Sequence, residues 1–184
     1  MDTGKKIKTM RKSTEYIFIH CSATKPSMDT DAKTIDRWHR ERGFLKIGYH
    51  FVIKRDGEKE LGRDLMEAGA HVKSYNHKSI GICMIGGVAE HDVNVADNNF
   101  TQEQWLTLKN LILDLKEQFP EAKIKGHNEV SSKACPSFDV QEWLFKNKII
   151  KTTPITTPEE KAELEEARAK IKGEQGDLFG NHTE

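Results

Sequence analysis

The hydrophobic positions of this chain fall into short runs separated by polar stretches, up to about residue 150. Residues 16–21, 49–53 and 79–87 are apolar or β-branched runs too short for helices, and each predicts a strand. Residues 79–87 are apolar at both alternating sets of positions, which is typical of a central strand covered on both faces. A short run at 122–126 predicts one further strand.

One pair of strands carries a clear turn signal. The dipeptide Asp56-Gly57 stands between two strand candidates, and this pair of residues favours the tight turn of a β-hairpin. We therefore expect residues 58–63 to run back antiparallel to residues 49–53.

Helical periodicity is strongest at residues 101–119, where Thr101 and Gln104 form a capping box. The apolar residues of this segment fall on one face, as expected for a helix that covers a sheet: Trp105, Leu108, Leu111, Ile112, Leu115 and Phe119. Shorter helices are expected from Thr34 to Gly43 and over residues 139–146. The alternation of elements predicts an α/β fold, with a mixed central β-sheet flanked by helices.

Charge changes this picture only at the two ends. The chain has 29 Lys+Arg and 29 Asp+Glu, and a zero net charge argues against a generally cationic nucleic-acid binder. Residues 1–12 carry a charge of +4 and predict a basic flexible arm. Residues 151–184 carry −3 and predict a linker followed by a charged helical appendage. Residues 13–150 then form a single domain with a charge of −1.

The surroundings of the protein can also be predicted. The chain contains no run of about 18 apolar residues, so no membrane span is expected. The basic N-terminal stretch has no apolar segment behind it, so we expect no secretory signal and accumulation in the cytoplasm. The odd number of scattered cysteines makes no disulfide framework and indicates a reducing compartment.

His20 is the first candidate for chemistry. Side chains alternate between the two faces of a strand, so Cys21 shares a face with Ile17 and Ile19 and is expected to pack in the core. Cys83, in the apolar central run, is expected in the core as well. His20 points the other way at the C-terminal end of its strand, where sites on sheets tend to form. A structural role remains the commoner one for a lone histidine there.

His127 and Cys135 flank a polar loop and form the second candidate. Both could bind one zinc ion, and a third ligand from elsewhere would leave the fourth position open to water, as in catalytic zinc sites. A cysteine–histidine nucleophilic pair is the competing interpretation. The spacing of the two residues does not decide between them.

Five stretches, in order along the chain, resemble the zinc-dependent N-acetylmuramoyl-L-alanine amidases: residues 19–24, 48–51, 54–57, 75–81 and 133–139. The small bacteriophage lysozymes of the amidase type are the most similar members, and the animal peptidoglycan recognition proteins are more distant. The resemblance covers roughly residues 14–150, and it implies that residues 13–150 are a zinc amidase domain.

The resemblance implies a role for each matching position. It assigns one Zn²⁺ per chain to His20, His127 and Cys135, and catalytic roles to Tyr49 and Lys133. All five positions hold the family residue. We therefore expect an active enzyme, and not a non-catalytic peptidoglycan-binding or regulatory module of the same fold.

The remaining histidines divide into two groups. The resemblance places His71 near the groove, as a candidate substrate-binding residue. The others match no motif. We expect His39 and His50 to be structural, and the remaining three to be exposed: His77, His91 and His182.

The implied reaction is hydrolysis of the amide bond between the lactyl group of N-acetylmuramic acid and L-alanine in bacterial peptidoglycan. Two imidazoles and one thiolate leave a zinc site with a net charge of +1, which lowers the pKa of bound water to about 7. Tyr49 and Lys133 are both candidates for delivering the proton to the leaving amine. The resemblance implies a phage or prophage endolysin, which would reach the cell wall after the membrane is permeabilised.

Overall fold

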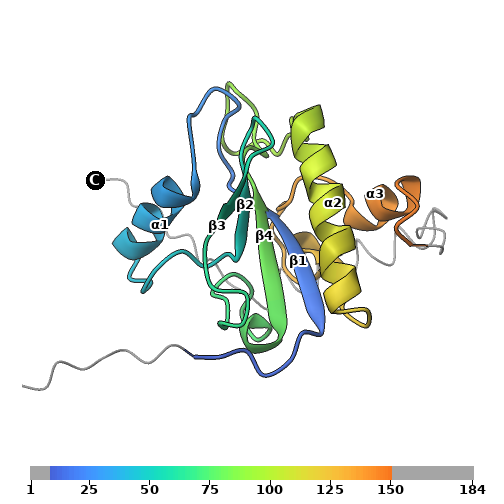
Figure 1. Ribbon diagram of the computed structural model, residues 1–184. Coiled ribbons are helices and arrows are strands. Elements are labelled where there is room, and N and C mark those ends of the chain that lie inside the picture. Colours follow the sequence, from blue (N-terminus) through green and yellow to red (C-terminus); the bar gives the residue numbers. More distant parts are fainter. Residues whose placement is uncertain (1–8, 151–184) are drawn as a thin grey trace, which may run out of the picture.

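The computed structural model describes residues 9–150, and their fold is a mixed five-stranded sheet between helices (Figure 1). The strand order across the sheet is β3-β2-β4-β1-β5. The strands are β1 (Tyr16–Cys21), β2 (Phe51–Ile53), β3 (Lys59–Leu61), β4 (Ser79–Met84) and β5 (Lys123–Gly126). Strands β1, β2, β4 and β5 pair in parallel, and β3 alone runs antiparallel to its neighbour β2. The predicted mixed α/β fold is confirmed.

Three α-helices cover the two faces of this sheet. They are α1 (Ala32–Glu41), α2 (Gln102–Gln118) and α3 (Val140–Lys146), with short 3₁₀ turns at η1 (Asn76–Lys78) and η2 (His127–Glu129). Figure 1 shows α1 on one side of the sheet and α2 with α3 on the other. The main apolar core lies on the α2–α3 side, and a smaller core lies beneath α1.

The side chains of β1 alternate as the sequence predicts. Ile17, Ile19 and Cys21 are buried in the main core beneath α2 and α3. His20 therefore projects from the other face of the sheet, on the side of α1. Cys83, on β4, is fully buried in the smaller core.

The local signals were accurate for the hairpin and for the long helix. Phe51 pairs with Leu61 in the β2–β3 hairpin, and Gly57 in its turn has a φ of +84°, which glycine adopts without strain. The Thr101 side chain accepts a hydrogen bond from the Gln104 main chain, and the Gln104 side chain accepts one from the Thr101 main chain.

Several boundaries differ from the prediction, and three of them have a clear local cause or consequence. Helix α1 begins earlier, at Ala32, because the Asp31 carboxylate caps its first turn. Strand β2 begins only at Phe51, so Tyr49 lies in the segment that leads into the strand. The predicted central strand also ends early, at Met84, because Gly86 and the glycine that follows it adopt positive φ.

Four residues of the expected basic arm, 9–12, lie within the described part of the chain, and they contact the domain. Arg11 is only 4% exposed, and its main-chain N–H donates to the carbonyl of Met66. Its guanidinium donates to the Leu65 carbonyl and lies over the Phe119 ring. Residues 9–12 therefore pack against the domain, because a guanidinium with acceptors and an aromatic face can be buried where a free charge cannot.

Two other predictions fall on residues outside the described range. The linker and helical appendage at 151–184 belong to this group, as does the N-terminal part of the arm. Among residues 9–150 no helix is long and apolar enough to span a bilayer.

Candidate metal centre and cleft

The site forms where two parallel strands end side by side. Ile19 of β1 is in register with Gly126 of β5, so the residues that follow them are neighbours. His20 and His127 are those residues, and their ring centroids lie 4.7 Å apart. The parallel pairing of β1 with β5 therefore brings together two side chains that are far apart in sequence.

The loop after β5 returns the third member of the cluster. The main-chain N–H of Asn128 donates to the carbonyl of Cys135 at 2.7 Å, which closes the loop. The Glu129 carboxylate accepts the Gly126 N–H at 2.7 Å and fixes its first turn. Neither contact was anticipated from the sequence, because each depends on the loop's folded path.

The three side chains converge in a geometry suited to one ion. The candidate ligand atoms of His20, His127 and Cys135 all lie within 4.8 Å of one another. The Cys135 sulfur is 3.7 Å from His20 Nδ1, and it accepts the Cys21 main-chain N–H at 3.2 Å. Cys21 therefore takes part in the site through its main chain, although its side chain packs in the core as predicted.

The chemistry of this donor set fits zinc. Two imidazoles and a thiolate are ligands that Zn²⁺ commonly takes in catalytic sites. Burial lowers the pKa of His127 to about 4, assisted by the charge of Lys133, and burial also lowers the pKa of His20 well below its usual value. Both rings are therefore neutral at pH 7, with a lone pair available for a metal.

The same environment disfavours a thiol nucleophile. Burial raises the pKa of the Cys135 thiol well above its ordinary value. A nucleophilic cysteine requires the opposite shift, toward thiolate at neutral pH. A cation bound between the three side chains would instead stabilise the thiolate as a ligand.

Tyr49 and Lys133 open onto the same cleft, which has a volume of about 250 Å³. The Tyr49 ring centroid lies 5.1 Å from that of His20. Burial raises the pKa of Tyr49 well above its usual value, so its hydroxyl keeps its proton and is able to donate a hydrogen bond; the buried Cys83 thiol is one group that it reaches. Lys133 is exposed at the cleft.

His71 also lines the cleft, but its ring nitrogens are engaged within the protein. Its Nδ1 lies 3.0 Å from His20 Nε2, and its Nε2 lies 3.3 Å from the Ser79 hydroxyl. The sequence therefore located His71 near the site and missed its partner Ser79. His71 was placed there by the family resemblance, and the structure adds that Gly69 and Gly81 make room for its ring.

His39 and His50 are structural, as expected. The Nδ1 atom of His39 accepts the Gly48 N–H at 2.8 Å, and that of His50 accepts the Gly81 N–H at 3.0 Å. The His50 Nε2–H donates to the main-chain carbonyl of Glu67 at 2.8 Å. His77 and His91 are exposed, and His182 lies outside the described residues.

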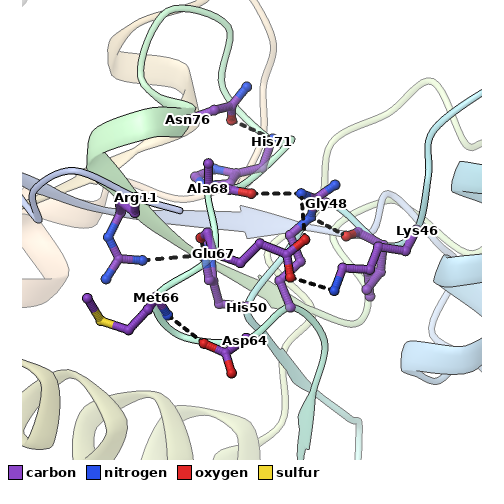
Figure 2. Close-up of polar contacts among 12 residues, drawn as sticks. Arg11, Lys46, Gly48, His50, Asp64, Met66, Glu67, Ala68, His71 and Asn76 are labelled. Carbon is purple, nitrogen blue, oxygen red and sulfur yellow. Dashed lines mark hydrogen bonds and ion pairs between the residues drawn. The ribbon is translucent and has the colours of Figure 1, made fainter. Parts of the chain in front are cut away.

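A buried ion-pair network lies beside these histidines and was not predicted. Figure 2 shows the Glu67 carboxylate reaching Lys46, and the two groups are 2.6 Å apart. Arg63 is 3.4 Å from the same carboxylate, and it also donates to the main-chain carbonyls of Ile47 and Ala68. The network fixes the segment that leads to His71.

Two histidines and a cysteine at the carboxyl edge of a sheet, in an open cleft, can hold a metal ion and leave one position open to water, which is the arrangement of catalytic zinc sites. Residues 10–138 match the N-acetylmuramoyl-L-alanine amidase family, and the chain belongs to that family. The activity class expected from the sequence is thereby confirmed.

Relatives and solved structures agree with this assignment. The endolysin of Escherichia phage T7 is 49% identical over 140 residues, which cover 76% of this chain and 91% of the relative. The endolysin of Klebsiella phage KP32 is 46% identical over 142 residues, covering 77% and 93%.

Among solved structures, the amidase LysC from Clostridium intestinale URNW is 26% identical with a TM-score of 0.64, covering 76% of this chain and 87% of that one. Drosophila PGRP-LB is 28% identical with a TM-score of 0.59, covering 71% and 78%.

Proposed function

We propose that this protein is a zinc-dependent endolysin that hydrolyses the amide bond between the N-acetylmuramic acid lactyl group and L-alanine of peptidoglycan. The observation that carries the zinc assignment is the convergence of His20, His127 and Cys135 within 4.8 Å. Family membership supports the substrate, and the similarity to phage endolysins supports the lytic role.

His20, His127 and Cys135 would hold the metal, with His20 using Nδ1 because its Nε2 faces His71. Zinc, when bound, supplies a Lewis acid and an activated water at neutral pH. Because the two imidazoles are neutral and the thiolate carries one negative charge, the site would have a net charge of +1 with zinc bound.

Tyr49 and Lys133 would act on the substrate. The tetrahedral intermediate of amide hydrolysis carries a developing negative charge on oxygen. The Lys133 ammonium, exposed at the cleft, provides a positive partner for that oxygen. The Tyr49 hydroxyl, held protonated by burial, would orient the attacking water by a hydrogen bond, and its place in the lining of the cleft supports this role.

The leaving amine needs a proton, and Tyr49 and Lys133 are the two groups that would deliver it. Single variants separate their roles, because a group that donates a proton also shapes the alkaline limb of the pH–rate profile. Tyr49→Phe or Lys133→Met should remove that limb if the altered residue is the donor.

The main test uses purified peptidoglycan and zinc-loaded protein. We expect release of peptides with a free N-terminal L-alanine and no new reducing sugar ends. A chelator should stop the reaction, and added zinc should restore it. Activity that survives removal of the metal would overturn the zinc assignment and favour the thiol mechanism.

A second test addresses the route to the cell wall. The protein added from outside should lyse Gram-negative cells whose outer membrane has been permeabilised and leave intact cells unharmed. The Cys135→Ser variant is the matched control, because it removes the ligand sulfur with a minimal change in shape. Equal lysis by both proteins would contradict the endolysin proposal.

A further inference from the structure

A chain of hydrogen-bond partners leads away from the metal cluster into the protein. His20 Nε2 lies 3.0 Å from His71 Nδ1, and His71 Nε2 lies 3.3 Å from the Ser79 hydroxyl. The Ser79 hydroxyl donates to the main-chain carbonyl of Tyr75 at 2.8 Å. Of these groups, the Tyr75 carbonyl is the only one that cannot donate a hydrogen bond.

That carbonyl fixes the direction of every bond in the series. Because the Tyr75 carbonyl only accepts, the Ser79 proton points toward it, and the Ser79 oxygen is left to accept from His71 Nε2–H. A neutral His71 with its proton on Nε2 carries a lone pair on Nδ1.

The lone pair of His71 then determines the state of His20. It accepts a proton from His20 Nε2, so a neutral His20 has no proton on Nδ1. Nδ1 is the atom that faces the Cys135 sulfur, at 3.7 Å. These hydrogen bonds therefore leave the lone pair of His20 on Nδ1, the nitrogen that faces the cluster and can bind a metal.

The His71 ring is held in a slot that only glycine allows. A Cβ atom at Gly69 would lie 2.4 Å from the ring, and one at Gly81 would lie 2.7 Å from it. The Asn76 side-chain oxygen accepts the main-chain N–H of His71 at 2.8 Å, which fixes the backbone (Figure 2). The ring is thus positioned by its surroundings and not by the metal cluster alone.

The neighbouring histidine offers no alternative partner. His50 stacks edge-on against His71 with centroids 5.8 Å apart, but both of its nitrogens are engaged. Its Nδ1 accepts from Gly81, and its Nε2 donates to the Glu67 carbonyl. His71 is therefore the acceptor for His20.

We propose that His71 is a positioning residue that, with Ser79 and the Tyr75 carbonyl, holds His20 in the tautomer and orientation that bind zinc through Nδ1. This inference rests on the proposed zinc function and adds to it. It assigns His71 to orienting a ligand, in place of the substrate contact expected from the sequence. Partners of this kind typically change metal affinity by roughly 10- to 100-fold.

The decisive comparison is between His71→Asn and His71→Leu. These two side chains have the same shape, and both leave the outer half of the ring's space empty. Only asparagine offers an oxygen near the place of Nδ1. The zinc dissociation constant, measured by competition with a chromophoric chelator, should rise by roughly 10- to 100-fold in His71→Leu. His71→Asn should recover at least part of that loss.

A purely structural role predicts the reverse order, because leucine suits a buried apolar slot better than asparagine. The inference is overturned if His71→Leu binds zinc as tightly as the unaltered protein, or if His71→Asn binds no more tightly than His71→Leu.

A second measurement needs neither zinc nor a variant. Nitrogen-15 NMR of the metal-free protein should show His20 with a protonated Nε2 and a bare Nδ1. A His20 protonated on Nδ1 would overturn the inference even if the position-71 variants failed to fold. These measurements do not depend on catalysis. An inactive protein with the expected tautomer would therefore contradict the proposed function but not the positioning role of His71.

Discussion

Two ion pairs with the same separation should differ sharply in what they contribute to stability. Glu67 lies 2.6 Å from Lys46, and Glu142 lies 2.6 Å from Lys146. The Glu67 side chain is 6% exposed, and its partner is 26% exposed. In the second pair, the side chains are 50% and 68% exposed.

The expected magnitudes follow from this difference in burial. Glu67→Gln removes a charge that two cations share, since Arg63 is also within 3.4 Å and only 10% exposed. Leaving a buried cation without its carboxylate costs about 3 kcal/mol. Glu142→Gln removes an exposed helix pair, which contributes at most about 0.5 kcal/mol.

The assay is urea unfolding at pH 7 in low salt, followed by the three tryptophans of the chain. The difference between the two variants should persist when salt is added, because the buried pair is screened less than the exposed pair. Equal losses for the two variants would refute the argument that burial decides. If Glu67→Gln lowers the free energy of unfolding by less than about 1 kcal/mol, the hydrogen bonds from Arg63 to main-chain carbonyls are enough to hold the network.

Further predictions concern the metal, the reaction and pH. Cys135→Ser should lose bound zinc, measured by metal analysis, together with hydrolysis of murein; full activity would contradict the ligand set. Tyr49→Phe should keep its zinc and lose about 100- to 1000-fold in kcat, as for loss of an oriented donor, and an unchanged kcat would remove Tyr49 from the mechanism. His39 and His50 have pKa values lowered by burial to about 4 from 6.5, so the unfolded chain takes up protons more readily. The contribution of these two neutral histidines to stability is therefore fully present above pH 6.5 and is lost as the pH falls toward 4; a flat urea midpoint over that range would contradict this.

Local signals predicted those elements whose causes are local. Helix α2 was recovered because Thr101 and Gln104 cap it and its apolar face repeats with helical period. The alternation along β1 correctly separated His20 from the core-packed Cys21. The relation between His20 and His127 came from resemblance to a family, since only the parallel pairing of β1 and β5 makes them neighbours.

The remaining features depend on tertiary contacts that leave little trace in the sequence. Arg11 was assigned to a solvated arm because its neighbours are basic, yet it finds acceptors and an aromatic ring in the folded domain. The sequence predicts Ser79 as part of an apolar strand. Its hydroxyl has a partner only in the folded chain, where it donates to the carbonyl of Tyr75, the residue before η1. His71 was placed correctly near the groove, but which atoms it contacts is a property of the slot.

The pairing of β5 with the outer side of β1 has a consequence for when the protein can become active. His20 is made early in synthesis, whereas Cys135 lies 115 residues further along the chain. A ribosome-bound chain that ends before β5 therefore carries only one of the three candidate ligands, His20. Once β5 docks, a metal held by these three residues would join segments more than a hundred residues apart, and it would stabilise the folded chain because the unfolded chain has no such site. The metal would thus link the ends of the first and last strands. Hydrolytic activity would arise only in a chain whose sheet is complete.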